Sequence, residues 1–217
     1  MYRVALCAGL AISLAACSMN SSSISSNYSP SAETRSIPDK KAVKGLALGG
    51  EPSAARTQVA NLQDKAPKGS YETAARGALS DRDYTSTALD HERALDLINQ
   101  YRSEKGLKPL RFNAKLTEAA KAHCRDLAKW DRISHFGSDG SNPWDRVKRT
   151  GYKARLAAEN VGTGQINFDE VLKGWKQSPG HDKNLLIQDG QEMGIALVQD
   201  PKTEFKSFWT LVIGTSM

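Results

Sequence analysis

The distribution of large apolar residues divides this chain of 217 residues at about position 87. Residues 18–36 are dominated by Ser with Asn and Pro, and residues 37–86 are rich in Ala, Lys and Gly with isolated Leu and Val. Segments of this composition cannot bury enough apolar surface to offset the entropy cost of ordering the chain. We therefore expect residues 17–86 to form a disordered tether and residues 87–217 to form one folded domain, which is long enough to build a core.

The N-terminus has the composition of an export signal. Arg3 precedes an apolar stretch, residues 4–16, which is too short to span a bilayer and ends at Cys17. The ending Leu-Ala-Ala-Cys resembles the bacterial lipobox, in which the signal is cut before a cysteine that is then acylated. We expect residues 1–16 to be a lipoprotein signal peptide and Cys17 to carry acyl chains such as palmitate that hold the protein at a membrane. The alternative is an ordinary signal peptide, which leaves Cys17 as a free thiol and the protein secreted.

Charge and position indicate the partners. By resemblance to lipoprotein sorting rules, Ser18 after the cysteine favours the outer membrane in a cell that has one. The formal charge is +6, but there is no basic run of five residues and no interleaving of aromatic residues. We therefore expect the membrane and an envelope ligand or protein as partners, and no nucleic acid.

The cysteines exclude a disulfide framework. Cys7 leaves with the signal, and acylation of Cys17 leaves Cys124 without a partner. Cys124 lies on the apolar stripe of a predicted helix, where burial suppresses the thiolate. Stability must therefore come from a packed core.

Periodicity and capping residues predict an α+β domain. Short β-branched and aromatic runs at 193–198 and 205–213 predict an antiparallel hairpin, with 156–161 as a third strand. Helices that come early and strands that come late indicate a layered α+β fold. Four helices are expected. The first runs from near Thr87 to Gly106, and the second begins after the cap Asn113. The third runs from the cap Asn142 to Gly151, and the fourth from the cap Asn167 to residues 178–180.

Three polar strings contain residues that core packing does not explain. His135 precedes a Gly-Ser-Asp-Gly turn, Glu159 interrupts an apolar strand, and His181 follows Ser-Pro-Gly at a helix end. A carboxylate in a buried strand must be paired or face a cleft. Two imidazoles and a carboxylate that converge can hold a divalent metal, bind an anion or carry out acid–base chemistry.

Other histidines and the tryptophans are expected to be structural. His123 lies in the middle of a predicted helix beside the buried stripe, and we expect it to be a hydrogen-bonded core histidine. His91 is expected to be solvated. Trp144, Trp175 and Trp209 lie in apolar helix or strand patterns, which predicts a role as core anchors.

Six strings in order resemble the CAP superfamily of cysteine-rich secretory, antigen 5 and pathogenesis-related proteins, in particular its bacterial secreted members, over residues 89–214. They are Ile-Asn-Gln-Tyr-Arg (98–102), Ser134-His135 with Asp139-Gly140, Arg146 through Gly151-Tyr152, Glu159-Asn160-Val161, Trp175 with Ser178-Pro179-Gly180-His181, and Glu192-Met193-Gly194-Ile195. The resemblance implies a three-layer α-β-α sandwich (SCP-like) with a cleft lined by two histidines and acidic residues. In some members this cleft holds a divalent cation such as zinc.

The resemblance also assigns site residues. It implies that His135, Glu159 and His181 line the cleft and are the candidate metal ligands, with Glu192 nearby. Many eukaryotic relatives have a further glutamate three residues after the helix tryptophan, where this chain has Ser178. The fourth cleft residue is therefore not assigned.

The expected function is ligand binding. The family resembled here is better known for binding sterols, lipids or proteins than for catalysis, and this chain has no His-Glu-x-x-His string. We expect a membrane-anchored module whose cleft engages a lipid, an envelope fragment or a protein, and not an enzyme. The alternative is a metal-dependent hydrolase or peptidase acting on cell-envelope material.

We predict that Cys17→Ser moves the protein from the membrane fraction to the soluble fraction, because the acyl chains are lost. Cell fractionation followed by immunoblotting measures the change, and Cys124→Ser is the control that leaves fractionation as in the wild type. A Cys17→Ser protein that stays in the membrane fraction would refute acylation at this residue.

Overall fold

The computed structural model describes residues 64–217, so the predicted signal peptide, Cys17 and the tether up to residue 63 lie outside the described residues. The elements in chain order are β1 (Tyr71–Glu72), α1 (His91–Glu104), β2 (Arg111–Phe112), α2 (Ala114–Trp130), β3 (Ile133–Ser134), α3 (Pro143–Arg149), β4 (Ala154–Thr163), α4 (Phe168–Gln177), α5 (Pro179–Leu185), β5 (Glu192–Gln199) and β6 (Ser207–Ser216).

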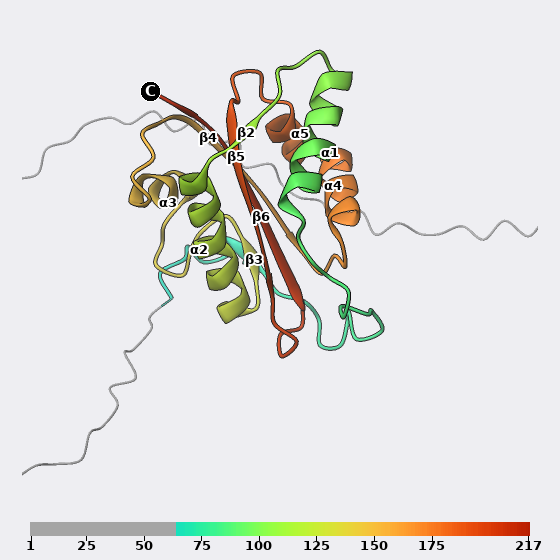
Figure 1. Ribbon diagram of the computed structural model, residues 1–217. Coiled ribbons are helices and arrows are strands. Elements are labelled where there is room, and N and C mark those ends of the chain that lie inside the picture. The colour runs from blue at the N-terminus through green and yellow to red at the C-terminus, as the bar shows by residue number, and fades with distance from the viewer. Residues whose placement is uncertain (1–63) are drawn as a thin grey trace, which may run out of the picture. The chain divides into compact units, whose positions relative to one another are not determined.

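A mixed four-stranded sheet in the order β2-β5-β6-β4 forms the central layer. β5 and β6 are an antiparallel hairpin, β4 pairs antiparallel with β6, and β2 joins β5 in parallel. Figure 1 shows the sheet nearly edge-on, with α2 and α3 on one side and α1, α4 and α5 on the other. This arrangement confirms the α-β-α sandwich, the hairpin and the third strand. Within residues 64–217, no helix combines the length and apolar character needed to cross a bilayer.

The two faces of the hairpin pack against different helices. Met193, Ile195 and Leu211 pack with α1, α4 and α5, whereas Ala196 and Val212 pack with α2. Alternate residues of a strand point to opposite faces, so both faces of these strands are buried. This explains why the hairpin reads as nearly continuous apolar runs in the sequence.

The predicted helix boundaries agree with the structure except at the start of the first helix, which begins at His91 after the cap Asp90 and not near Thr87. The side chains of Asn113, Asn142 and Asn167 each accept hydrogen bonds from backbone amides of the first turn of their helix. Asn142 and Asp145 form a reciprocal capping box. Gly106 follows α1 with φ of +70°, in the left-handed region that glycine adopts without steric cost.

The string at the end of α1 joins this helix to two loops. The side-chain amide of Asn99 bonds to both backbone groups of Leu110, at 2.7 and 3.0 Å. Arg102 is fully buried, and its guanidinium donates to the carbonyls of Leu185, the last residue of α5, and of Ile187 in the loop that follows. These contacts show that the polar residues of the string at 98–102 stabilise the fold, so no functional site is needed to explain them.

Residues 64–86 pack on the domain, although their composition predicts a tether. β1 pairs antiparallel with β3, and the hydroxyl of Tyr84 donates to the carbonyl of Gly164 at 2.8 Å. Arg82 and Glu170 form an ion pair at 2.6 Å. These contacts use backbone and charged groups, so the scarcity of apolar residues does not exclude them. Ordered structure therefore begins before residue 87, the position where composition predicts the domain to start.

One predicted core tryptophan is exposed. Trp175 and Trp209 are buried as predicted, but Trp144 is 38% exposed. Trp144 lies in the first turn of α3, a short helix whose buried residues are Arg146 and Val147. The helix turns these two residues inward and leaves Trp144 at the surface, so its predicted core role is wrong.

Gly194 allows α2 to approach the sheet closely. A Cβ atom at this position would lie 2.0 Å from the backbone nitrogen of Thr117, in the first turn of α2. The clash is with backbone, so the helix itself must shift to accommodate any side chain. This contact accounts for the glycine in the Glu192–Ile195 string.

We predict that Gly194→Ala lowers the free energy of unfolding by about 3 kcal/mol, because overpacking displaces α2. Gly174→Ala is the matched control: its Cβ meets nothing within 4 Å in the interior of α4, so alanine should stabilise the helix by about 0.5–1 kcal/mol. Urea denaturation measures both effects. Equal changes in the two variants would contradict this account of the packing.

Candidate functional site

The structure brings His135, Glu159 and His181 together from three separate elements. His135 follows β3, Glu159 lies in β4 and His181 lies in α5. The Nδ1 atom of His135 is 3.0 Å from Oε1 of Glu159, and the ring centroids of His135 and His181 are 6.5 Å apart. We call these three residues the His/Glu site.

The floor of the His/Glu site is a buried ion pair. The side chain of Glu159 is 1% exposed, and Nη2 of Arg146 lies 2.9 and 2.7 Å from its two oxygens. Arg146 is also buried, and the same Nη2 donates to the carbonyl of His135 at 3.0 Å. A buried carboxylate needs a counter-charge, and Arg146 supplies it.

The sequence only partly predicts that Arg146 is the counter-charge of Glu159. The argument from Glu159 requires a partner but does not identify it. Arg146 is one of three basic residues in α3, with Lys148 and Arg149, and only the fold shows which of them faces the sheet. The capping box at Asn142 fixes the start of α3, and so the position of Arg146 on its first turns.

Glu159 is ionised and orients His135. Burial alone would raise the pKa of Glu159, but the neighbouring His123 and Arg146 and the hydrogen bond from His135 outweigh it and hold the pKa well below its usual range. An ionised carboxylate only accepts hydrogen bonds. The Nδ1–H of His135 therefore donates to Glu159, and within residues 64–217 its Nε2 makes no hydrogen bond, on a side chain that is 48% exposed.

Two asparagines hold His181 against β4. Nδ2 of Asn160 donates to the carbonyl of His181 at 3.0 Å. Nδ2 of Asn184 donates to the carbonyl of Glu159 and to Oδ1 of Asn160, each at 3.0 Å. Burial, together with the nearby His135 ring, lowers the pKa of His181 to about 4. His181 is therefore neutral at neutral pH and keeps a ring nitrogen with a free lone pair.

His123 lies directly behind the site. It is fully buried, with Nε2 at 2.8 Å from the carbonyl of Ser134 and 3.6 Å from Oε1 of Glu159. Burial lowers its pKa. His123 is thus a core histidine as predicted, but its Nδ1 has no hydrogen-bond partner among residues 64–217, so it is only half satisfied.

Glu192 belongs to a different part of the sheet. It lies at the start of β5, which is separated from β4 by β6. Its carboxylate accepts hydrogen bonds from the side chains of Asn113 (3.0 Å) and Tyr152 (2.6 Å) and so supports the start of α2. These contacts give Glu192 a structural role at the cap of α2, and its predicted place near the cleft stays a prediction.

The two imidazoles suit a divalent cation better than the predicted set of three ligands. The oxygens of Glu159 are occupied by Arg146 and His135, and the guanidinium would repel a cation bound between them. Metal-binding histidines commonly donate their second ring N–H to a carboxylate, which is the role of Glu159 here. Within residues 64–217, no group of three or more His, Cys, Asp or Glu side chains has an arrangement suited to a metal. The contacts of Glu159 with Arg146 and His135 therefore make His135 and His181 the stronger ligand candidates of the three, and the metal site stays a prediction.

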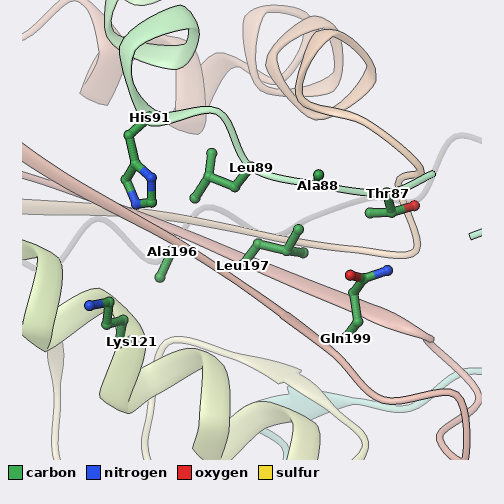
Figure 2. Close-up of a pocket in the computed structure, with 8 residues that line it drawn as sticks. All are labelled: Thr87, Ala88, Leu89, His91, Lys121, Ala196, Leu197 and Gln199. Atoms are coloured by element: carbon green, nitrogen blue, oxygen red, sulfur yellow. The ribbon is translucent and has the colours of Figure 1, made fainter. Parts of the chain in front are cut away.

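A separate hollow of about 260 Å³ lies beside β5 (Figure 2). Its walls come from residues 87–89 and His91 on one side and from Lys121 of α2 on the other, with Leu197 of β5 between them. β2 pairs with only two residues of the longer β5, so the rest of that edge has no partner strand among residues 64–217, and the hollow lies beside it. The hollow is lined by none of the three residues of the His/Glu site.

Comparisons with known proteins agree with the fold. The chain matches the cysteine-rich secretory protein family (CAP) over residues 95–213. It is 31% identical over 126 residues to the protein YkwD of Bacillus subtilis (58% of this chain, 47% of that protein). It is 28% identical over 134 residues to the membrane protein YlbC of the same bacterium (58% and 39%). The chain thus spans less than half the length of these curated relatives.

Two solved structures are similar over most of the described domain. An extracellular protein with an SCP domain from Bacillus anthracis superposes with a TM-score of 0.51 at 26% identity, covering 58% of this chain and 40% of that chain. An outer surface protein from Borrelia burgdorferi superposes with a TM-score of 0.53 at 20% identity, covering 59% and 97%. The second likeness shows the fold alone.

We predict that Glu159→Gln lowers the free energy of unfolding at pH 7 by about 3–5 kcal/mol, because Arg146 is left buried without a counter-charge. The pKa of Glu159 is depressed in the folded state, so the stability it contributes is present above the unfolded-state pKa of about 4.3 and is lost as pH falls through the lower folded-state value. The difference between wild type and variant should therefore shrink below about pH 4. Asp169→Asn, which breaks a solvent-exposed pair with Arg93, should have a much smaller effect, because water and salt screen an exposed pair. Denaturation curves from pH 3 to 7 measure these differences, and a loss no larger than that of Asp169→Asn would contradict the buried pair.

Proposed function

The chain belongs to the cysteine-rich secretory protein (CAP) family, and on this basis we propose that it is a membrane-anchored, extracytoplasmic module that binds an envelope ligand at the His/Glu site. The location is supported by the export signal in the sequence and by relatives described as an extracellular protein, an outer surface protein and a membrane protein. Acylation of Cys17 would supply the anchor.

The facing imidazoles of His135 and His181 carry this proposal. His135 is half-exposed and its Nδ1 is held by Glu159, while His181 is neutral and held by Asn160. The site therefore offers the ring nitrogens of two neighbouring imidazoles, beside an ion pair that has no net charge. Such a pair of nitrogens suits a zinc or similar divalent cation, or a polar ligand group that accepts or donates hydrogen bonds.

A divalent cation held by His135 and His181 would supply a Lewis acid for a carbonyl or anionic oxygen of the ligand. The chain's own groups have preparatory roles. Glu159 fixes the ring orientation of His135, and Arg146 keeps Glu159 ionised and prevents it from turning toward the cation. The remaining coordination positions would be open to water or to the ligand itself.

A hydrolytic mechanism with a cysteine nucleophile is disfavoured by the state of the one cysteine among the described residues. Cys124 is fully buried, and burial raises the pKa of its thiol to about 12. A thiol in this state does not act as a nucleophile. Its Sγ instead lies 3.1 Å from Oγ1 of Thr210, in the core between α2 and the sheet.

We predict that the purified chain binds zinc, and that His135→Ala and His181→Ala each weaken binding at least about tenfold, because each removes one of two nitrogen ligands. Isothermal titration calorimetry measures the affinity, and circular dichroism checks that both variants fold. His91→Ala is the matched control, since His91 is exposed at the start of α1 and outside the site.

Equal zinc affinity in the wild type, His135→Ala and His181→Ala would remove the cation from this proposal. Turnover of peptidoglycan fragments or lipid esters by the zinc-loaded protein, lost in His135→Ala, would replace the binding role with hydrolysis. Saturable binding without turnover supports the binding module.

A further inference from the structure

Residues 64–72 contact the start of the loop that carries His135. We call this stretch the docking segment and residues 132–141 the His135 loop. Oδ2 of Asp64 lies 2.5 Å from Nη1 of Arg132, and the Tyr71 ring lies 4.8 Å from the same guanidinium. β1 of the docking segment pairs with β3 of the His135 loop (Figure 1), with Tyr71 opposite Ser134.

The docking segment also contacts the far end of the same loop. The amide of Lys65 donates to the carbonyl of Ser138 at 2.7 Å. A Cβ atom on Gly140 would lie 3.2 Å from the carbonyl oxygen of Lys65, so the two backbones are in close contact. The loop is therefore held on both sides of His135, although no residue of the docking segment is part of the His/Glu site.

Ser134 connects the docking segment to the site. Its hydroxyl donates to the carbonyl of Ser70 at 2.7 Å and accepts from the amide of Phe136 at 2.9 Å, which encloses His135 in a tight turn. Its carbonyl accepts from Nε2 of His123 at 2.8 Å, behind Glu159. Loss of the docking segment would thus release one side of the residue that precedes His135.

The contact between the docking segment and the His135 loop depends on Arg132. It is 1% exposed, yet its Nε and Nη2 atoms have no hydrogen-bond partner among residues 64–217, and within these residues its ion-pair partner is Asp64. The rings of Tyr71 and Trp130 cover the guanidinium. A buried guanidinium with so few donors satisfied is stable only while its counter-charge is in place. Removal of Asp64 should therefore expose Arg132 to water and separate the docking segment from the His135 loop.

We infer that the docking segment is a detachable positioning element of the His/Glu site. In the docked state it holds His135 hydrogen-bonded to Glu159 and opposite His181. In the undocked state the His135 loop is released and this alignment is lost. Ligand binding and docking are then coupled, because each favours the same loop conformation.

Asp64 and Tyr71 are on this account positioning residues, which act on the ligand only through His135. Both lie outside the region that matches the family, residues 95–213. The coupling between docking and ligand binding rests on the proposed function of the His/Glu site. The effect of docking on the position of His135 does not depend on that proposal.

The ring tautomer of His135 tests the inference in the full chain. In the wild type, ¹⁵N NMR should show Nδ1–H on His135, because Glu159 accepts that proton, with the signal assigned by its loss in His135→Ala. Asp64→Ala and Tyr71→Ala should shift His135 toward the Nε2–H form and weaken zinc binding about tenfold. Asp64→Glu should restore the wild-type signal, since it keeps the charge opposite Arg132.

Arg82→Ala is the matched control, because Arg82 belongs to the same ordered stretch but pairs with Glu170 of α4, away from the His135 loop. It should leave the tautomer and the zinc affinity unchanged. A wild-type tautomer in both Asp64→Ala and Tyr71→Ala, or an equal change in Arg82→Ala, would overturn the inference. If the wild type does not bind zinc, the metal proposal fails, and the tautomer alone decides the role of the docking segment.

Discussion

The buried pair of Glu159 and Arg146 is the interaction on which the site depends. Glu159 stands in the strand that faces α2 and α3, where an unpaired carboxylate would be prohibitively costly. Arg146 resolves this cost, and because its guanidinium also bonds to the carbonyl of His135, the same contact joins α3, β4 and the His135 loop. The pair occupies both carboxylate oxygens, so Glu159 orients an imidazole and does not offer itself to a ligand.

A second set of contacts makes the opposite wall. Asn160 follows Glu159 in β4, and its side chain and that of Asn184 tie the strand to the helix that carries His181. Neighbouring residues of one strand thus hold the two histidines: Glu159 holds His135 by its side chain, and Asn160 holds His181 by its backbone. This explains why Glu159 and Asn160 stand next to each other in the middle of β4, between apolar neighbours. The family supplies the fold, and these local bonds determine the spacing of the imidazoles.

Local sequence signals predict the fold well because they act over a few residues. The asparagine caps, Gly106 and the hairpin all follow from contacts within one turn or between adjacent strands. The errors come from long-range contacts: the docking segment is held by Arg132 and backbone pairing, and Trp144 is exposed because α3 turns Arg146 inward. At the site, three polar strings predict the participants. Their roles depend on Arg146 of α3, the counter-charge of Glu159, and the spacing of the strings does not identify that residue.

The most direct test is a crystal structure of the chain grown with zinc. The account predicts a cation bound by the rings of His135 and His181, with Glu159 still paired with Arg146 and hydrogen-bonded to Nδ1 of His135. A cation bound by the carboxylate of Glu159 with Arg146 displaced, or two histidine rings turned away from each other, would contradict it.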